Sequence, residues 1–224
     1  NIVIVPFYED EKSLNFLLKD LKQTFKNNFY IIVVDDGSLT CKITDKNLKL
    51  LNVNGSILRL KRNVGHQHAI AVGMRHIYRK ISQKHSIIIM DCDGEDLPSS
   101  AKILSDEVSK EDVDIVVAKR SKRTENFLFK LFYIIYKFFF YFLTGRIIDF
   151  GNFIALKKEA VNRLASMPEL STHIAASVIS SKLKIKKIPI NRGKRYAGHS
   201  KMSFVSLILH GFRALMVFTE EVLV

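Results

Sequence analysis

Short apolar runs alternate with longer helix-like stretches along the first half of the chain. The strand-like runs are 1–5, 31–35, 56–60, 86–90 and 113–118. The helix-like stretches lie near 11–26, 64–81 and 99–109. This alternation is typical of βαβ units, and it predicts an α/β fold with a mostly parallel, Rossmann-like sheet flanked by helices. In such sheets ligands bind at the carboxyl ends of the strands.

Acidic residues gather where three of the predicted strands end. The clusters are Glu9-Asp10-Glu11, Asp35-Asp36 and Asp91-Cys-Asp-Gly-Glu-Asp96. Asp91 and Asp93 are two residues apart, so in an extended chain their carboxylates point to the same side. Two hard oxygen ligands in this arrangement suit Mg²⁺ or Mn²⁺. The alternative is an acidic turn in which Asp96 or Ser99 caps the next helix. Three acidic strand ends on one rim favour a nucleotide and metal site.

Composition narrows the class of protein. A chain of 224 residues with 47% apolar residues can bury a full core. Its two cysteines provide no disulfide framework, which indicates a reducing compartment, and Cys92 is interpreted as a packed small residue rather than a nucleophile. The net charge is +13, and 170–219 contains no acid. Such a stretch attracts phosphates of nucleic acid, an anionic membrane or a phosphorylated substrate, although it could also be a solvated basic face.

Aromatic residues dominate 126–143, which carries seven Phe and three Tyr together with two lysines. We expect a helix lying in a membrane interface, with a core helix as the alternative. The last segment, 203–224, is expected to be amphipathic rather than membrane-spanning, and no complete transmembrane helix is expected. The predicted organisation is therefore a catalytic domain over 1–202, including the interfacial helix, followed by this C-terminal segment.

Several motifs follow one another in a fixed order. They are Val5-Pro-Phe-Tyr-Glu-Asp10, Val34-Asp-Asp-Gly-Ser38, Arg62-Asn-Val-Gly-His-Gln-His-Ala69, Met90-Asp-Cys-Asp-Gly-Glu-Asp96, Asp149-Phe-Gly-Asn-Phe153 and Arg195-Tyr-Ala-Gly-His-Ser-Lys201. From Ile2 to about Ser203 the chain thus resembles the inverting family 2 glycosyltransferases, especially dolichyl-phosphate mannose synthase and the bacterial polyprenyl-phosphate glycosyltransferases. Three positions depart from the pattern: Glu9 stands where Asn is usual, Thr40 replaces Asp, and Glu95 replaces Gln.

The resemblance implies a GT-A fold and a role for each matching residue. The expected nucleotide-sugar-binding residues are Pro6, Tyr8, Asp10, Asp35, Asp36, Arg62, Asn63, Gly65, Asp91 and Cys92. The expected ligands of Mg²⁺ or Mn²⁺ are Asp91, Asp93 and Glu95. The expected catalytic residues are Asp93, Asp96, Arg120, Arg195 and Lys201, and those of the acceptor side are Lys130, Asp149, Gly151, Asn152 and Ser200. His66 and His68 are interpreted as helix-entry packing or substrate contacts rather than metal ligands, because two carboxylates are available.

The implied activity is transfer of a sugar from a UDP- or GDP-sugar to a polyprenyl phosphate, undecaprenyl or dolichyl, at the cytoplasmic face of the cell membrane. A phosphate acceptor is already ionised, whereas a saccharide hydroxyl, the alternative acceptor in surface polysaccharide assembly, would need Asp96 or Asp149 as base. A membrane scaffold is a further alternative. A nucleic-acid partner is disfavoured, because acidic strand ends repel phosphates. A homo-oligomer is compatible with the sequence.

Overall fold

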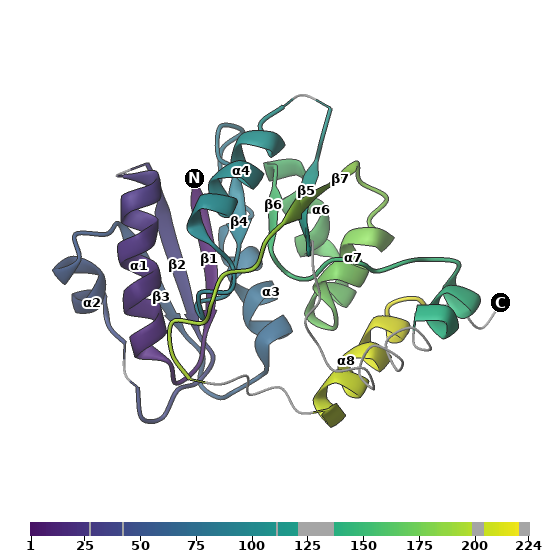
Figure 1. Cartoon of the computed structure of the whole chain (residues 1–224), viewed down its shortest axis with the longest axis horizontal. Helices are drawn as coiled ribbons and strands as arrows, with labels where there is room; N and C mark the ends of the chain where they lie inside the picture. The colour runs from purple at the N-terminus through teal and green to yellow at the C-terminus, as the bar shows by residue number, and fades with distance from the viewer. Residues whose placement is uncertain (27, 42, 111, 121–136, 199–203, 220–224) are drawn as a thin grey trace.

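A seven-stranded sheet organises the computed structural model, which describes residues 1–219 except 27, 42, 111, 121–136 and 199–203 (Figure 1). The strands are β1 (Ile2–Phe7), β2 (Tyr30–Asp35), β3 (Gly55–Arg59), β4 (Ile87–Ile89), β5 (Ile115–Arg120), β6 (Ile154–Leu156) and β7 (Ile185–Ile190). Their order is β3-β2-β1-β4-β6-β5-β7. Every neighbouring pair is parallel except those of β6, which runs antiparallel to β4 and β5. The predicted mostly parallel α/β sheet is confirmed.

Helices cover both faces of the sheet (Figure 1). They are α1 (Glu11–Phe25), α2 (Asp45–Leu50), α3 (His66–Ile77), α4 (Pro98–Val108), α6 (Lys158–Ser166), α7 (Ile174–Ser180) and α8 (Phe204–Met216), with a 3₁₀ turn at Pro168–Ser171. The apolar residues of α1 and α4 pack against one face, and those of α3, α6 and α7 against the other.

Strand residues supply the two cores alternately. Val3 and Val5 of β1 join the core under α1 and α4, whereas Ile4 between them joins the core under α3. This alternation follows from the two-residue period of a strand, and a sheet buried on both faces needs apolar side chains at both sets of positions. That is why the strands read as continuous apolar runs in the sequence.

One rim of the sheet collects the segments that carry the predicted motifs. Because β1, β2, β4, β5 and β7 run in the same direction, their carboxyl ends meet at the lower rim in Figure 1. The antiparallel β6 places its amino end, preceded by 149–153, at this same rim. The topology therefore brings together motifs that are up to about 190 residues apart in the chain.

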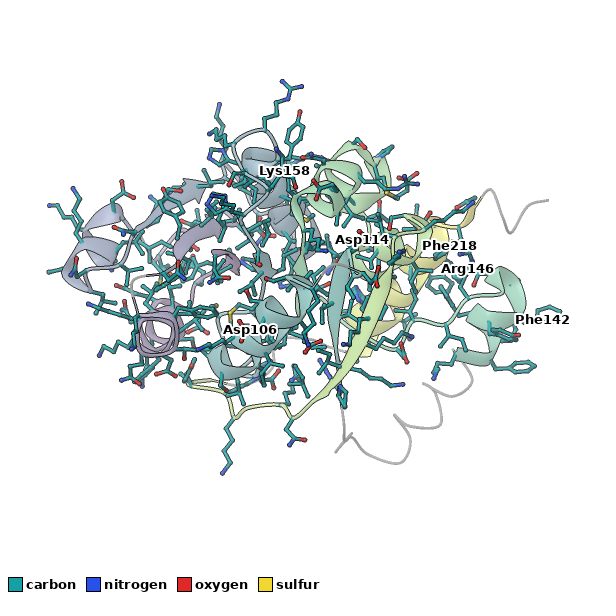
Figure 2. All side chains as sticks on the ribbon, turned by 90° about the horizontal axis from the view of Figure 1, so that it is seen from above. Asp106, Asp114, Phe142, Arg146, Lys158 and Phe218 are labelled. Atoms are coloured by element: carbon teal, nitrogen blue, oxygen red, sulfur yellow. The ribbon has the colours of Figure 1, made fainter. Side chains whose placement is uncertain are left out.

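The C-terminal part forms a small third core beside the sheet. Phe140, from a helical stretch at 137–144, packs edge-on against Phe218 with ring centroids 5.8 Å apart, and Ala214 lies in the same cluster. Phe142 points away from the body, whereas Phe218 lies against it beside Arg146 (Figure 2). Most of the predicted interfacial helix lies outside the described residues. Within the part of the chain that is described, no helix has the length and apolarity needed to cross a membrane.

Two strands were not predicted. β6 has only three residues, which is too short to stand out as an apolar run. In β7, Lys186 and Lys187 interrupt the apolar residues, and the stretch reads as part of the basic region instead. Edge strands carry such lysines because a charged edge resists pairing with other chains.

Candidate functional site

The first acid after β2, Asp35, is a structural residue of the loop that follows. Its side chain is fully buried, its Oδ1 accepts a hydrogen bond from the Ser38 N–H at 3.0 Å, and its Oδ2 forms an ion pair with Arg59 Nε at 2.9 Å. A carboxylate enclosed in this way does not reach a ligand at the rim. Asp35 thus has an internal role in this structure, and its expected contact with the nucleoside stays a prediction.

The second acid, Asp36, ties the β2 end to the start of α3. Its two oxygens accept hydrogen bonds from the N–H groups of Val64 at 2.7 Å and Gly65 at 2.9 Å. The chain packs so tightly here that a Cβ on Gly37 would lie 2.4 Å from the carbonyl carbon of Arg62, and Gly37 also has a φ of +74°. Arg62 and Asn63, both exposed, are thereby held beside the Asp-Asp-Gly-Ser motif.

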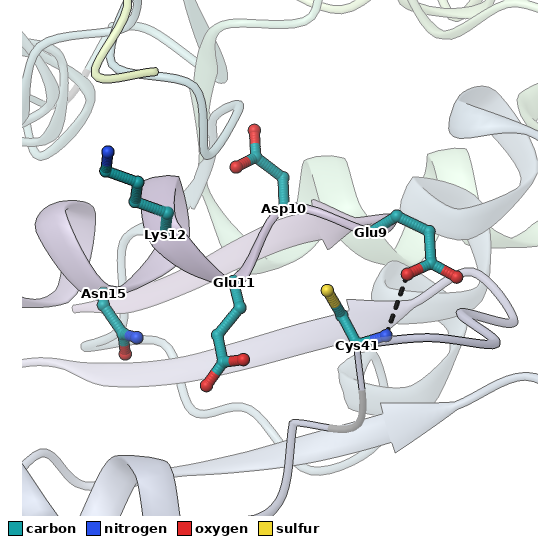
Figure 3. A pocket seen from close by; sticks show the side chains of 6 residues that line it. All are labelled: Glu9, Asp10, Glu11, Lys12, Asn15 and Cys41. Atoms are coloured by element: carbon teal, nitrogen blue, oxygen red, sulfur yellow. Dashed lines mark hydrogen bonds between the residues drawn. The ribbon is translucent and has the colours of Figure 1, made fainter. Parts of the chain in front are cut away.

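Glu9, after β1, closes the loop that follows Asp36. Its carboxylate accepts hydrogen bonds from the N–H groups of Thr40 and Cys41, each at 2.9 Å, and from the Thr40 hydroxyl. The hydrogen bond from the Thr40 hydroxyl is the largest cause that lowers the pKa of Glu9 to about 2. A cleft of about 490 Å³ lies beside this loop. Figure 3 shows the hydrogen bond from Cys41 to Glu9 among its lining residues. The lining residues are Glu9, Asp10, Glu11, Lys12, Asn15 and Cys41.

Other predicted nucleotide contacts differ in their exposure. Tyr8 is 41% exposed at the rim, and Asp10 accepts a hydrogen bond from the Ser13 N–H at 3.2 Å, which caps α1. Pro6 is buried within β1, and Cys92 is buried in the core, where burial raises the pKa of its thiol. Cys92 is thus a packed residue, as its position suggested, and its expected contact with the nucleotide sugar stays a prediction.

The acids after β4 are contacted by side chains from distant parts of the chain. Asp91 Oδ1 lies 2.8 Å from His66 Nε2, and Asp93 Oδ2 lies 3.0 Å from an Arg195 guanidinium nitrogen. Asp96 accepts a hydrogen bond from the Asp91 N–H at 3.0 Å. The carboxylates of Asp91 and Asp93 each face a group that is, or can become, positively charged.

Glu95 does not contribute a free carboxylate to this cluster. It forms ion pairs with Arg192 and, at 3.2 Å, with Arg195 Nε, and only 15% of its side chain is exposed. In this structure Glu95 anchors two arginines, which a Gln would hold less strongly, and its expected role as a metal ligand stays a prediction.

These arginines belong to a strap, which we define as residues 191–198 after β7. The strap crosses the rim towards α1 (Figure 1) and is fixed to the β4 loop by the Tyr196 N–H, which donates to the Asp93 carbonyl at 2.8 Å. The Tyr196 ring stacks on Phe16 with centroids 5.7 Å apart, and its hydroxyl donates to Asp20 at 2.5 Å. A Cβ on Gly94 would lie 2.6 Å from the Tyr196 ring, so this position accepts only glycine.

Burial and mutual repulsion separate the pKa values of the clustered acids. Burial and the charge of Asp91 raise the pKa of Asp96 well above its usual range, and the same two causes raise the pKa of Asp93. Burial also acts on Asp91, but the His66 ring, aided by Arg192, lowers its pKa below the ordinary value. Asp91 is thus the carboxylate most firmly held in its charged form.

The acceptor-side residues that precede β6 lie at the same rim. Asn152 Nδ2 is 3.4 Å from His66 Nδ1, and Gly151 is exposed beside it. Asp149 pairs with Lys119 at 2.9 Å and Lys187 at 2.7 Å. Although burial opposes them, these lysines lower the pKa of Asp149, which makes it a poor base. In this structure Asp149 bridges β5 and β7, and its expected place on the acceptor side stays a prediction.

The remaining expected residues complete the picture. Arg120 ends β5 at the rim and is exposed. Lys130, Ser200 and Lys201 lie outside the described residues. Sequence reasoning missed the contact of His66 with Asp91 and the role of Arg192. The role of Arg192 could have been suspected from the sequence, because Arg192 and Arg195 are three residues apart in a stretch without acids.

A family model described as glycosyl transferase family 2 matches residues 2–170. The chain therefore belongs to the family 2 glycosyltransferases, and the protein is a glycosyltransferase, as predicted.

Relatives agree with this assignment. The uncharacterized glycosyltransferase YkcC of Bacillus subtilis is 24% identical over 233 residues, which cover 98% of this chain and 68% of that protein. The undecaprenyl-phosphate 4-deoxy-4-formamido-L-arabinose transferase of Photorhabdus laumondii is 28% identical over 219 residues, covering 92% of this chain and 64% of that protein. The chain thus spans about two thirds of the length of these relatives.

A solved structure confirms the predicted GT-A fold. Glucosyl-3-phosphoglycerate synthase from Mycobacterium tuberculosis, crystallised with Mn²⁺, UDP and glucosyl-3-phosphoglycerate, matches with a TM-score of 0.70 at 13% identity. The match covers 100% of this chain and 80% of that one.

Proposed function

We propose that the protein transfers a sugar, with inversion, from a nucleotide-diphosphate sugar to a polyprenyl phosphate. The observation that carries this proposal is the meeting, at one rim, of two carboxylates suited to a cation and three arginines suited to phosphates. The carboxylates are those of Asp91 and Asp93, and the arginines are Arg120, Arg192 and Arg195. Arginine recognises phosphate oxygens in bidentate fashion and keeps its charge at every physiological pH.

The proposed metal is Mg²⁺ or Mn²⁺, held by Asp91 and Asp93. Among the described residues, no three His, Cys, Asp or Glu side chains form a complete metal-binding group. We therefore propose that the cation takes one or two protein carboxylates and completes its coordination with diphosphate oxygens and water, as Mg²⁺ commonly does. Both carboxylates already accept a cationic or hydrogen-bonding partner, which fits their use as ligands. When bound, the metal would neutralise the charge that develops on the departing diphosphate.

The chain's own residues would perform three tasks. Arg120 and Arg192, which lie close enough to Asp91 to lower its pKa, would stabilise the diphosphate. Arg195 would exchange its ion pair with Asp93 for one with a phosphate when the donor binds. An ionised phosphate acceptor needs no base. The cluster of acids after β4 would then act only in binding the metal and the donor.

The exposed apolar surface of the C-terminal part supports an acceptor carried by a membrane. On α8, Val205, Leu209, Phe212 and Met216 recur at helical spacing and are 51–65% exposed. The exposed Arg213 belongs to the same helix, so apolar and basic groups occur together, as expected of a helix at an anionic membrane surface. The name of the Photorhabdus relative, which specifies undecaprenyl phosphate, points to the same class of acceptor. The proposed site of action is the cytoplasmic face of the cell membrane.

Asp96 supports a second candidate, transfer to a saccharide hydroxyl. A hydroxyl acceptor must lose its proton, and burial together with the charge of Asp91 raises the pKa of Asp96, which makes it a stronger base than an ordinary carboxylate. The two candidates share the donor and differ in what Asp96→Asn would do. Transfer to a hydroxyl would fall by about 100-fold or more, whereas transfer to a phosphate would change far less.

The donor is tested by thermal stabilisation with a panel of UDP- and GDP-sugars, with Mn²⁺ or with EDTA. One sugar should stabilise the folded chain only with Mn²⁺, by about 2.7 kcal/mol at a concentration 100 times its Kd. Asp93→Ala should abolish this effect, while Asp106→Ala, an exposed acid on α4 (Figure 2), should retain it. Metal-independent stabilisation, or equal stabilisation of both variants, would contradict the proposal.

The acceptor is tested by supplying the chosen donor with undecaprenyl phosphate, dolichyl phosphate or a free oligosaccharide. The membrane contribution is measured by sedimentation with vesicles containing anionic lipid. Phe212→Ser should weaken binding to these vesicles, whereas Leu50→Ser, which removes an 85% exposed leucine from α2, should not. Transfer to the oligosaccharide alone would favour the second candidate.

A further inference from the structure

His66 occupies a fixed position at the first turn of α3. The loop before it is held by Asp36, whose oxygens accept the N–H groups of Val64 and Gly65, and Gly65 precedes the helix with a φ of +91°. From there the imidazole reaches across the rim to the β4 loop, where Nε2 lies 2.8 Å from Asp91 Oδ1. Asp36 of the first acidic motif thus holds the start of α3, and His66 at this helix start contacts Asp91 of the second motif.

A buried glutamine determines which ring nitrogen of His66 donates. The Gln67 Oε1 accepts a hydrogen bond from the Ile174 N–H at 2.7 Å, so its amide nitrogen is the atom that faces His66 Nδ1 at 3.5 Å. Asn152 also directs its amide nitrogen at Nδ1, at 3.4 Å. Because amide nitrogens only donate, Nδ1 is the acceptor and Nε2 carries the proton that is donated to Asp91. A neutral imidazole is sufficient for this arrangement.

We infer that His66, oriented by Gln67 and Asn152, is the positioning residue of Asp91, and that it joins the metal-binding loop to the acceptor side of the site. A hydrogen bond to one oxygen of a ligand carboxylate fixes the direction of the other, and such outer partners change metal affinity by about 10- to 100-fold when removed. Gln67 is 5% exposed and is held by α7, so the contact with Asp91 is tied to the body of the fold. The inference rests on the proposed function, because it assigns Asp91 to a metal.

The experiment is a Mn²⁺ titration of the full chain at a fixed concentration of the stabilising nucleotide, read by calorimetry. His66→Ala should raise the Mn²⁺ concentration for half-saturation by about 10- to 100-fold. His66→Gln keeps a donor where Nε2 stood and should restore most of the affinity, whereas His66→Asn places its amide where Nδ1 stood and should resemble His66→Ala. Because 42% of the His66 side chain is exposed, these variants should keep the thermal midpoint of the parent.

His68→Ala is the matched control, since it removes an exposed histidine from the same turn of α3 and should leave Mn²⁺ binding unchanged. A titration in which His66→Ala matches His68→Ala, while Asp93→Ala abolishes binding, would overturn the inference and leave the proposed function intact. Equal behaviour of His66→Gln and His66→Asn would also contradict a positioning role. If the parent chain binds no Mn²⁺ with any nucleotide, both proposals fail together.

Discussion

Two acidic strand ends lie at the same rim and differ in what holds their carboxylates. Asp36, after β2, accepts two backbone N–H groups, and Asp35 beside it accepts one together with the ion pair from β3. After β4, Asp91 Oδ1 faces the His66 imidazole, whereas Asp93 accepts the Glu95 N–H at 2.9 Å with Oδ1 and faces the Arg195 guanidinium with Oδ2. The two pairs of acids also differ in exposure: Asp35 and Asp36 are 0% and 4% exposed, whereas the side chains of Asp91 and Asp93 are 35% and 15% exposed.

This difference distinguishes acids that stabilise the fold from acids that can bind a ligand. A backbone N–H cannot leave a buried carboxylate unless the loop around it rearranges, so the acids after β2 are permanent parts of the fold. Asp91 and Asp93 are partly exposed, and the His66 and Arg195 side chains that face them can rotate away, so an oxygen of each carboxylate can become available to a metal. Motif chemistry alone does not distinguish the two cases, whereas burial and the identity of the partner atoms together do.

The largest expected effect follows from removing an exchangeable carboxylate. Asp93→Asn should lower the rate of sugar transfer by about 10²- to 10³-fold, because the stabilisation of the departing diphosphate is lost. Its stability should be unchanged or higher, because burial and Asp91 already disfavour the charged form of Asp93. Transfer assays and urea unfolding of the same preparation measure the two effects. A large loss of stability would place Asp93 with the structural acids.

The matching change after β2 should do the reverse. Asp36→Ala leaves the half-buried N–H groups of Val64 and Gly65 without their acceptor, at a cost of about 2 kcal/mol in the free energy of unfolding. The urea midpoint measures this cost, and Asp106→Ala on the surface of α4 serves as the control. An unchanged midpoint for Asp36→Ala would show that the loop finds other acceptors, and the comparison would then fail.

The sequence predicted the positions of the acids well and their partners poorly. Apolar runs that end in acids locate the strands, and a parallel sheet brings the strand ends together. The partners come from segments far apart in the chain: Asp91 meets His66 from the start of α3, and Asp93 meets Arg195 from beyond β7. No local pattern specifies such pairs, because they depend on how the loops cross the rim.

Two departures from the family pattern illustrate the same limit. Taken singly, Glu9 and Thr40 each suggest a weakened motif. In the structure the Thr40 hydroxyl donates to the Glu9 carboxylate, so the two departures meet in one contact. The extra charge of Glu95 is likewise matched by Arg192 and Arg195. Each departure is thus paired with another residue of this chain, and no single motif reveals such a pair.

A smaller effect is expected where a side chain and a metal use the same carboxylate. Arg195→Ala removes the cation that faces Asp93, so Mn²⁺ alone should bind about two- to fivefold more tightly, as expected for the loss of one partly exposed ion pair. With nucleotide present the advantage should disappear, because the arginine is then needed at the phosphates. Calorimetry with and without UDP or GDP measures both. Lys194→Ala, in the same strap, controls for the loss of positive charge, and weaker binding of Mn²⁺ alone to Arg195→Ala would argue against exchange.

The smallest effect concerns Glu9, which belongs with the acids held by backbone. Its hydrogen bonds, first that from the Thr40 hydroxyl, lower its pKa to about 2, whereas an unfolded glutamate titrates near about 4.3. A depressed folded pKa means that the contribution of Glu9 to stability is fully present above the unfolded pKa and is lost as the pH falls through about 2. Glu9→Gln should therefore be slightly less stable than the parent at pH 7, and the two should converge in acid.

Thermal midpoints between about pH 7 and pH 2 test this, with Glu159→Gln on α6 as the control. Parallel curves for the parent and Glu9→Gln would show that the negative charge of Glu9 does not stabilise the loop at 39–41. The hydrogen bonds of the side chain would then be sufficient to hold this loop.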